Sequence, residues 1–199
     1  GSIVSDTLAM TATSGAITET NGYVVNAGAL NVAAGQGITL SSEVNKLKNV
    51  VIDNAGDSVT IVSSNDVAGD LNVSTAESKI VNGNINVTNV AAGSALNEIV
   101  VDKALQASGN ITLVNNESDI NVNANALVAA ANIMLQADGN AVNFNGGSLT
   151  TTATNGKLDA RGNNISIAGS EIDAAIVETT ATNDLVMSGG SISATDATM

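Results

Sequence analysis

The chain contains no histidine and no cysteine. Their absence removes the Ser-His-Asp and Cys-His catalytic arrangements and most zinc and other transition-metal sites. The chemistry that remains is that of carboxylates, which glycan-cleaving enzymes use in pairs. The places to consider are therefore those where acidic side chains gather beside a base.

The densest such place lies near the C-terminus. Glu171 and Asp173 stand two residues apart, so on one strand both point outward. The repeat spacing described below places Lys157 and Asp159 on the neighbouring coil, with Arg161 beyond. A small acid-base patch is one interpretation, and an ion pair of Lys157 with Glu171 on a solvated face is the other. We favour the ion pair, since exposed pairs contribute only ~0–1 kcal/mol and need no function, and we expect no enzyme activity.

Two further carboxylates, Glu98 and Asp119, fall in the same outward column of earlier coils. Like charges in contact repel each other unless a cation bridges them, and Ca²⁺ binds carboxylate oxygens readily. Glu98 and Asp119 are therefore weak candidates for a metal site. The nonapeptide calcium repeat of toxin-type β-rolls is absent, and we expect neither a resident metal nor any other cofactor.

The composition limits the partners and the kind of core. The net charge of -13 argues against nucleic acid or an anionic membrane as a partner. No apolar run approaches the ~20 residues that span a bilayer. The only aromatic residues are Tyr23 and Phe144, so a core must be filled by Ala, Val, Ile and Leu. The absence of cysteine is compatible with an exported chain that does not depend on disulfides.

Two series of apolar residues recur through the chain with spacings mostly of 19 to 22 residues. The first series is Leu8, Leu30, Val50, Leu71, Val90, Ile111, Ile133, Leu149, Ile165 and Leu185. The second series is Ile17, Ile38, Val59, Ile80, Ile99, Ile120, Val142, Leu158, Ile172 and Ile192. A weaker third series runs through Val24, Val44, Val67, Val87, Leu105 and Leu127. A shared period of this length is typical of stacked repeats.

Three short strands per repeat predict a right-handed parallel β-helix. We expect a three-sided solenoid of about ten coils of roughly 20 residues, forming one domain over residues 1–199. An antiparallel sandwich of about twenty strands is the alternative, because alternation of apolar and polar residues alone does not exclude it. The common phase of the three series favours the β-helix.

Asparagine or aspartate precedes the first series in seven coils. These residues accept left-handed backbone conformations and bond to nearby backbone, and stacked amides bond to the coils above and below. The sequence therefore predicts a structural column at one corner, made of Asn49, Asp70, Asn89, Asn110, Asn132, Asn164 and Asp184.

The units at residues 7–17 and 29–38 resemble the L-x-L-x-A-x-x-G-x-I repeats of filamentous-haemagglutinin-type (two-partner secretion) adhesins, and residues 132–139 fit the same pattern. Other exported bacterial β-helix passengers carry similar repeats. The resemblance implies a long rod that projects from the bacterial cell surface. The secretion domain of that family is not recognisable, and Gly1-Ser2 without a methionine looks like a cleavage scar. We therefore expect a fragment of a longer chain.

We expect a non-catalytic shaft or repeat segment of a secreted surface adhesin or filament, located outside the bacterial cell. Its expected partners are neighbouring coils of the parent protein or further copies stacked end to end, and host surfaces or glycans are further candidates. One alternative is a polysaccharide-degrading or glycan-binding β-helix. Another is an ice-binding solenoid, which needs a regular Thr-x-Thr column, but Thr11 and Thr13 are not repeated coil after coil.

Overall fold

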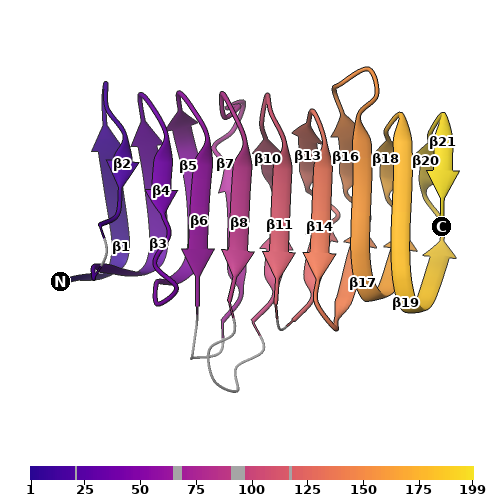
Figure 1. Ribbon diagram of the computed structural model, residues 1–199, viewed down its shortest axis with the longest axis horizontal. Helices are drawn as coiled ribbons and strands as arrows, with labels where there is room; N and C mark the ends of the chain where they lie inside the picture. The colour runs from indigo at the N-terminus through magenta and orange to yellow at the C-terminus, as the bar shows by residue number, and fades with distance from the viewer. Residues whose placement is uncertain (21, 65–68, 91–96, 117) are drawn as a thin grey trace.

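Short segments of alternating apolar and polar residues form strands that stack along one axis. In the computed structural model, residues 1–20, 22–64, 69–90, 97–116 and 118–199 are described, and they form an all-β parallel solenoid of about eight turns. The N- and C-termini lie at opposite ends of the rod (Figure 1). Every pairing between named strands is parallel. No helix among the described residues is long and apolar enough to cross a membrane.

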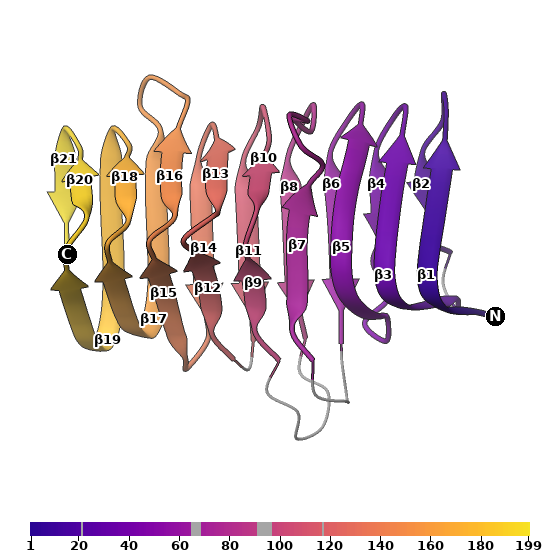
Figure 2. The same ribbon diagram turned by 180° about the vertical axis from the view of Figure 1, so that it is seen from behind.

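Sixteen strands form one sheet that wraps around two faces of the rod. The first face, in the foreground of Figure 2, contains β1 (Ser2–Ala12), β3 (Val24–Ala34), β5 (Lys46–Ala55), β7 (Leu71–Thr75), β9 (Ile99–Val101), β12 (Ile120–Asn123) and β15 (Ala141–Asn145). The second face, in the foreground of Figure 1, contains β2 (Ile17–Thr18), β4 (Ile38–Leu40), β6 (Val59–Ser63), β8 (Ile85–Asn89), β11 (Ile111–Asn115) and β14 (Ile133–Ala137).

Towards the C-terminus two long strands join these faces, and a third face forms. β17 (Lys157–Ala168) pairs with β14 through its first half and with β15 through its second half. β19 (Ile176–Ser188) follows β17, and β21 (Asp196–Thr198) follows β19. The third face is a separate sheet of five strands, β10 (Ala104–Gln106), β13 (Leu127–Ala130), β16 (Ser148–Thr151), β18 (Glu171–Asp173) and β20 (Ser191–Ser193).

The core is a set of apolar columns that run along the axis. On the second face the register aligns Ile17, Ile38, Val59, Ile85, Ile111, Ile133, Leu158, Val177 and Ala197. On the third face it aligns Leu105, Val128, Leu149, Ile172 and Ile192. Phe144 is fully buried, whereas Tyr23 is 54% exposed. Small and aliphatic side chains therefore fill a narrow interior with a single aromatic ring.

The parallel solenoid is confirmed, but the count of ten coils is wrong. Val59 pairs with Ile85, 26 residues later, and not with Ile80, which is 58% exposed. Leu71 pairs with Ile99, 28 residues later. The middle turns are thus longer than the assumed period, and the extra residues fall in the three connections from β6 to β9, including the one between β7 and β8 that contains Ile80. About eight longer turns replace ten short ones. The right-handed sense of winding stays a prediction.

The predicted apolar series consequently pass from one face to another. The first series starts on the first face with Leu8 and continues on the second face with Ile111. In the third series Val44 and Leu127 are exposed, and Val67 lies outside the described residues. The physical reason is that inward residues of all three faces look alike in sequence, so a fixed period selects whichever one lies nearest.

Two glycines of the N-terminal turns, Gly28 and Gly37, have a steric role. A Cβ atom on Gly37 would lie 2.9 Å from the carbonyl oxygen of Ser58 in the next turn, and one on Gly28 would lie 2.9 Å from that of Asp6 in the previous turn. Neither glycine has a positive φ. Close approach of adjacent turns, rather than left-handed backbone, therefore requires glycine at these positions.

One inner corner of the solenoid is polar. At the ends of β6, β8 and β11 the register stacks Ser63, Asn89 and Asn115, all buried. The Ser63 hydroxyl accepts from the Leu47 amide (3.0 Å), and Asn115 Nδ2 donates to the Asp119 carbonyl (2.9 Å). These side chains thus satisfy backbone groups where the chain turns from the second face to the first.

Replacing Phe144 with alanine tests the core. The Phe144→Ala variant should lose about 3–5 kcal/mol of unfolding free energy, because a cavity remains in a narrow column that is held on both sides by neighbouring turns. Urea unfolding followed by circular dichroism measures the loss. Tyr23→Ala is the control and should change stability by less than about 0.5 kcal/mol. Equal effects of the two changes would contradict this description of the core.

Candidate functional site

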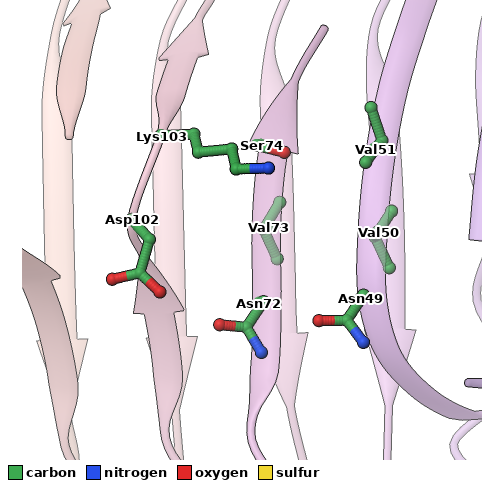
Figure 3. A pocket seen from close by; sticks show the side chains of 8 residues that line it. All are labelled: Asn49, Val50, Val51, Asn72, Val73, Ser74, Asp102 and Lys103. Carbon is green, nitrogen blue, oxygen red and sulfur yellow. The ribbon is translucent and has the colours of Figure 1, made fainter. Parts of the chain in front are cut away.

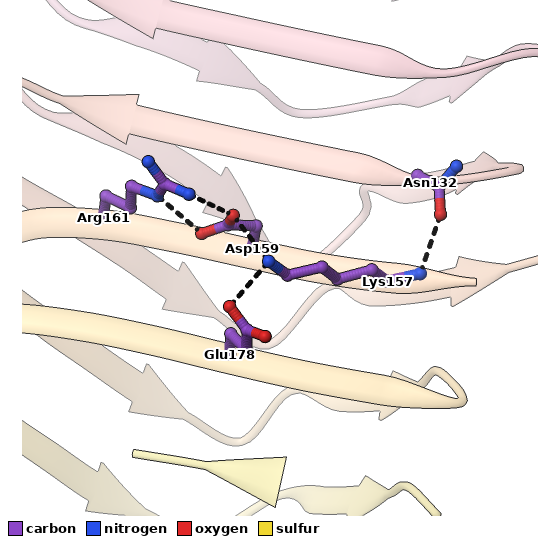
Figure 4. Close-up of polar contacts among 5 residues, drawn as sticks. All are labelled: Asn132, Lys157, Asp159, Arg161 and Glu178. Atoms are coloured by element: carbon purple, nitrogen blue, oxygen red, sulfur yellow. Dashed lines mark hydrogen bonds and ion pairs between the residues drawn. The ribbon is translucent and has the colours of Figure 1, made fainter. Parts of the chain in front are cut away.

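Four charged side chains form a network on the outer side of the second face (Figure 4). Arg161 on β17 contacts both carboxylate oxygens of Asp159, with Nε at 2.8 Å from Oδ1 and Nη2 at 2.6 Å from Oδ2. The Lys157 ammonium lies 3.0 Å from Asp159 and 2.6 Å from Glu178 on β19. Asp159 is buried beneath these two cations, with 7% of its surface exposed.

The pKa shifts in this network describe stable ion pairs. Hydrogen bonds from Arg161, and then from Lys157, hold the pKa of Asp159 below its ordinary value of 3.8, although burial acts in the opposite direction. The bonds to Glu178 and then Asp159 raise the pKa of Lys157 above 10.5. A catalytic acid or base needs a pKa near the working pH, and these shifts lead away from neutrality. In this network the charged forms of Lys157 and Asp159 are stabilised by their partners.

The structure corrects the partner that the sequence predicts for Lys157. Glu171 and Asp173 lie on β18, in the third face, where Glu171 pairs with Ser148 and Ser191. Lys157 lies on the second face and pairs with Ile176. The sequence places Leu158 and Ile172 in one column, but they belong to different faces, so their charged neighbours do not meet. The predicted acid-base patch is thus divided between two faces.

Glu98 and Asp119 lie on adjacent turns, just before β9 and β12. The Glu98 carboxylate accepts from Asn121 Nδ2 (2.6 Å), and Asp119 Oδ1 accepts from the Ala141 amide (2.8 Å). Burial, and then the charges of Asp70 and Asp119, raise the pKa of Glu98 above its ordinary value of 4.5, against the bond from Asn121. Within the described ranges, no three His, Cys, Asp or Glu are grouped to hold a metal.

The seven predicted corner residues do not form one column. Asn110 and Asn132 are consecutive and bond through their amides (2.8 Å), and Asn164 is aligned with Asp184. Asp70 accepts from the backbone amide of Glu98 (3.2 Å). Two other members lie elsewhere: Asn49 lies within β5 and donates to the Gly28 carbonyl (2.8 Å), and Asn89 is buried in the inner corner.

Amide ladders also run along the outer side of the first face, and the sequence pattern did not predict them. Asn143 donates to Asn121 (2.9 Å), and Asn145 donates to Asn123 (3.2 Å). Asn123 in turn donates to Asp102 (2.6 Å). The signal was present as Asn-Val-Asn in β12 and Asn-Phe-Asn in β15, with the asparagines at outward positions, but it becomes visible only when the register is known.

A notch with a mixed polar and apolar lining interrupts the first face where these ladders end (Figure 3). It is lined by Asn49, Val50, Val51, Asn72, Val73, Ser74, Asp102 and Lys103. Asn49 and Asn72 are register partners on β5 and β7, and Figure 3 shows their amides side by side with the Lys103 side chain reaching towards Ser74. The sequence pattern did not predict this notch, because its lining comes from three successive turns of unequal length.

Comparison with protein-family models, with curated proteins and with solved structures gave no match to this chain.

Removing the charge of Asp159 tests the ion network. Because the pKa of Asp159 is lower in the folded chain, its stabilisation is present above the ordinary pKa and is lost as pH falls through the folded value. Asp159→Asn should cost about 1–2 kcal/mol at neutral pH, after solvent screening of the exposed cations. In urea unfolding, the difference in unfolding free energy between the parent chain and Asp159→Asn should become smaller in acid. The exposed Asp173→Asn is the control, and a pH-independent difference would contradict the pairing.

Neutralising Glu98 should raise the stability of the fold at neutral pH, whereas neutralising Asp159 lowers it. The raised pKa of Glu98 means that the charged form is disfavoured in the fold, so stability is lost as pH rises through that pKa. Glu98→Gln keeps an acceptor for Asn121 and should add a few tenths to about 1 kcal/mol at neutral pH, with no gain in acid. Thermal unfolding with and without Ca²⁺ distinguishes the alternative, since a Ca²⁺-dependent stabilisation that the variant loses would support a metal site.

Proposed function

We propose that this chain is a non-catalytic shaft or repeat segment of a secreted bacterial surface adhesin or surface filament. The observation that carries the proposal is the unbroken column of nine inward positions from Ile17 to Ala197, in which each turn pairs in register with the next. Such a rod holds its ends apart, and its length depends only on the number of turns.

The adhesin-like repeats support this proposal through their geometry. The repeats at residues 7–17 and 29–38 begin on β1 and β3 and end in β2 and β4, so each repeat corresponds to part of one turn. The glycine before Ile38 is the position where the next turn passes closely. The second repeat therefore matches the steric needs of a parallel β-helix passenger, whereas a Cβ atom on Gly15 of the first repeat would meet open space. A filamentous-haemagglutinin-type adhesin at the bacterial cell surface is the family in which we place this function.

The surface chemistry is that of a spacer. The net charge of -13 favours solubility and discourages lateral association. Within the Lys157 network the charged groups pair with one another, and within the Asn121–Asn143 ladder the amides bond to one another. Lys157 and Asp159 do line a shallow hollow of the second face, but their charges are paired with each other and with Arg161 and Glu178. A polysaccharide-degrading enzyme on the same fold is therefore the weaker proposal.

One observation favours the ice-binding alternative. The register aligns Thr18, Thr39 and Thr60 on the outer side of the second face, and Thr112 follows after Asn86. This column is one residue wide and is interrupted, whereas an ice-binding face needs two regular columns. We expect no thermal hysteresis from the purified chain, and a measurable hysteresis that Thr39→Lys abolishes would instead favour this alternative.

The ends of the rod provide the test of the shaft proposal. Leu8 and Met10 at one end, and Leu185 and Ile192 at the other, are only partly buried, and Met187 is 50% exposed. These apolar ends and their free strand edges fit further coils of the parent chain or another copy. Sedimentation velocity should show elongated oligomers that grow with protein concentration. Growth should be stronger in about 1 M NaCl, where the Debye length of ~3 Å screens the repulsion between negatively charged chains.

Met187→Lys should abolish this association, because it places a charge on the apolar end. Ile80→Lys is the matched control, since Ile80 is similarly exposed (58%) but lies on the side of the rod. A chain that stays monomeric at high concentration and high salt, or an equal effect of both changes, would contradict end-to-end stacking.

A further inference from the structure

The notch on the first face arises from a break in strand pairing. β7 pairs with β5 over four residues, from Asn72 to Thr75. It pairs with β9 only at Leu71 and Asn72. β9 ends at Val101, and the chain then leaves the first face through Asp102 and Lys103 to begin the third face. Strand pairing with the next turn therefore stops after Asn72, although the Thr75 hydroxyl still donates to the Ala104 carbonyl (3.2 Å). A shallow hollow remains on the outer side, between β7 and the segment of Asp102 and Lys103.

The polar groups that line this hollow are not all used within the protein. Asn49 donates to Gly28, which leaves its carbonyl oxygen as an acceptor. The side chain of Asn72 makes no hydrogen bond to the described part of the chain, and Lys103 makes no ion pair there. Asp102 accepts one bond from Asn123 through Oδ1, so Oδ2 is available. These groups contrast with the amide ladders and the ion network, where donors and acceptors are matched.

The chemistry of the lining identifies the class of ligand. The lining offers amide donors and acceptors, one carboxylate, one ammonium group and the hydroxyl of Ser74. The charges of Asp102 and Lys103 cancel, so the notch favours neither a cation nor an anion. Closely spaced donors and acceptors of this kind recognise neighbouring hydroxyl groups, each of which both donates and accepts. Val50, Val51 and Val73 supply apolar surface beside these groups, which is the larger share of the lining.

We propose that the notch formed by Asn49, Asn72, Asp102 and Lys103 binds one sugar unit of a neutral glycan. This site goes beyond the proposed shaft function, and each can hold without the other. The notch is open and has no aromatic platform, so a single sugar unit binds weakly, with a Kd of about 1 mM or above. Several such segments on one surface would bind a glycan-coated surface through avidity.

The test is a titration of the ¹⁵N-labelled chain with the methyl glycosides of glucose, galactose and N-acetylglucosamine, followed by two-dimensional NMR. At least one glycoside should shift the side-chain amides of Asn49 and Asn72 and the backbone amides of Asp102 and Lys103 in a saturable way. Asn72→Ala and Lys103→Ala should each weaken binding about three- to tenfold, the effect of one lost hydrogen bond.

Two matched variants control for unspecific effects. Asn86→Ala removes a half-buried, outward amide from β8, on the second face, and Lys79→Ala removes an exposed lysine outside the notch. Both should leave binding unchanged, and all four variants should unfold at the temperature of the parent chain. No saturable shift with any glycoside, shifts at other residues, or equal losses in the control variants would overturn the proposal. Binding only of sialylated or sulfated sugars, dependent on Lys103 alone, would also overturn it.

Discussion

The hydrogen bonds between successive parallel turns are the interaction on which the rest of this structure depends, because no turn satisfies its own backbone. Each strand of a face donates to and accepts from the strands before and after it in the stack, as Ile111 does with Ile85 and Ile133. The register is therefore shared along the whole rod. An inward residue in one turn fixes an inward residue in the next, and a column of Ile, Val and Leu results.

The same constraint accounts for the polar interior corner. Where a strand ends and the chain turns, backbone groups lose their partners in the stack, and a buried unpaired group costs free energy. Asn115 bonds from inside to the carbonyls of Asn97 and Asp119 (3.0 and 2.9 Å), and Asn45 accepts from the Val25 amide (2.8 Å). Buried asparagine is thus a substitute for missing strand pairing, and it ties neighbouring turns together at the corner.

The sequence was sufficient to predict the architecture, because few folds besides a solenoid place alternating apolar residues at a common period along the whole chain. It did not predict the turn count, since Ile80 and Ile85 are both isoleucines at a plausible distance from Val59, and only pairing distinguishes them. The ion network was half predicted: Lys157, Asp159 and Arg161 were recognised as one group, but Glu178 replaces Glu171 as the second acid. Local pattern identifies an outward residue, but it does not identify the face.

Asparagine illustrates the limit most clearly. Asn132 in a corner ladder, Asn89 in the buried corner and Asn143 on an outer face all precede or follow apolar residues of strands. Their environments differ because the amide is both donor and acceptor and so satisfies whichever group lies opposite. Composition therefore predicts that asparagines stack, whereas the longer middle turns decide where. Those same turns interrupt the pairing of β7 with β9. A regular solenoid uses its polar side chains on itself, so a site for a ligand is expected where the regularity fails, as it does beside Asn72.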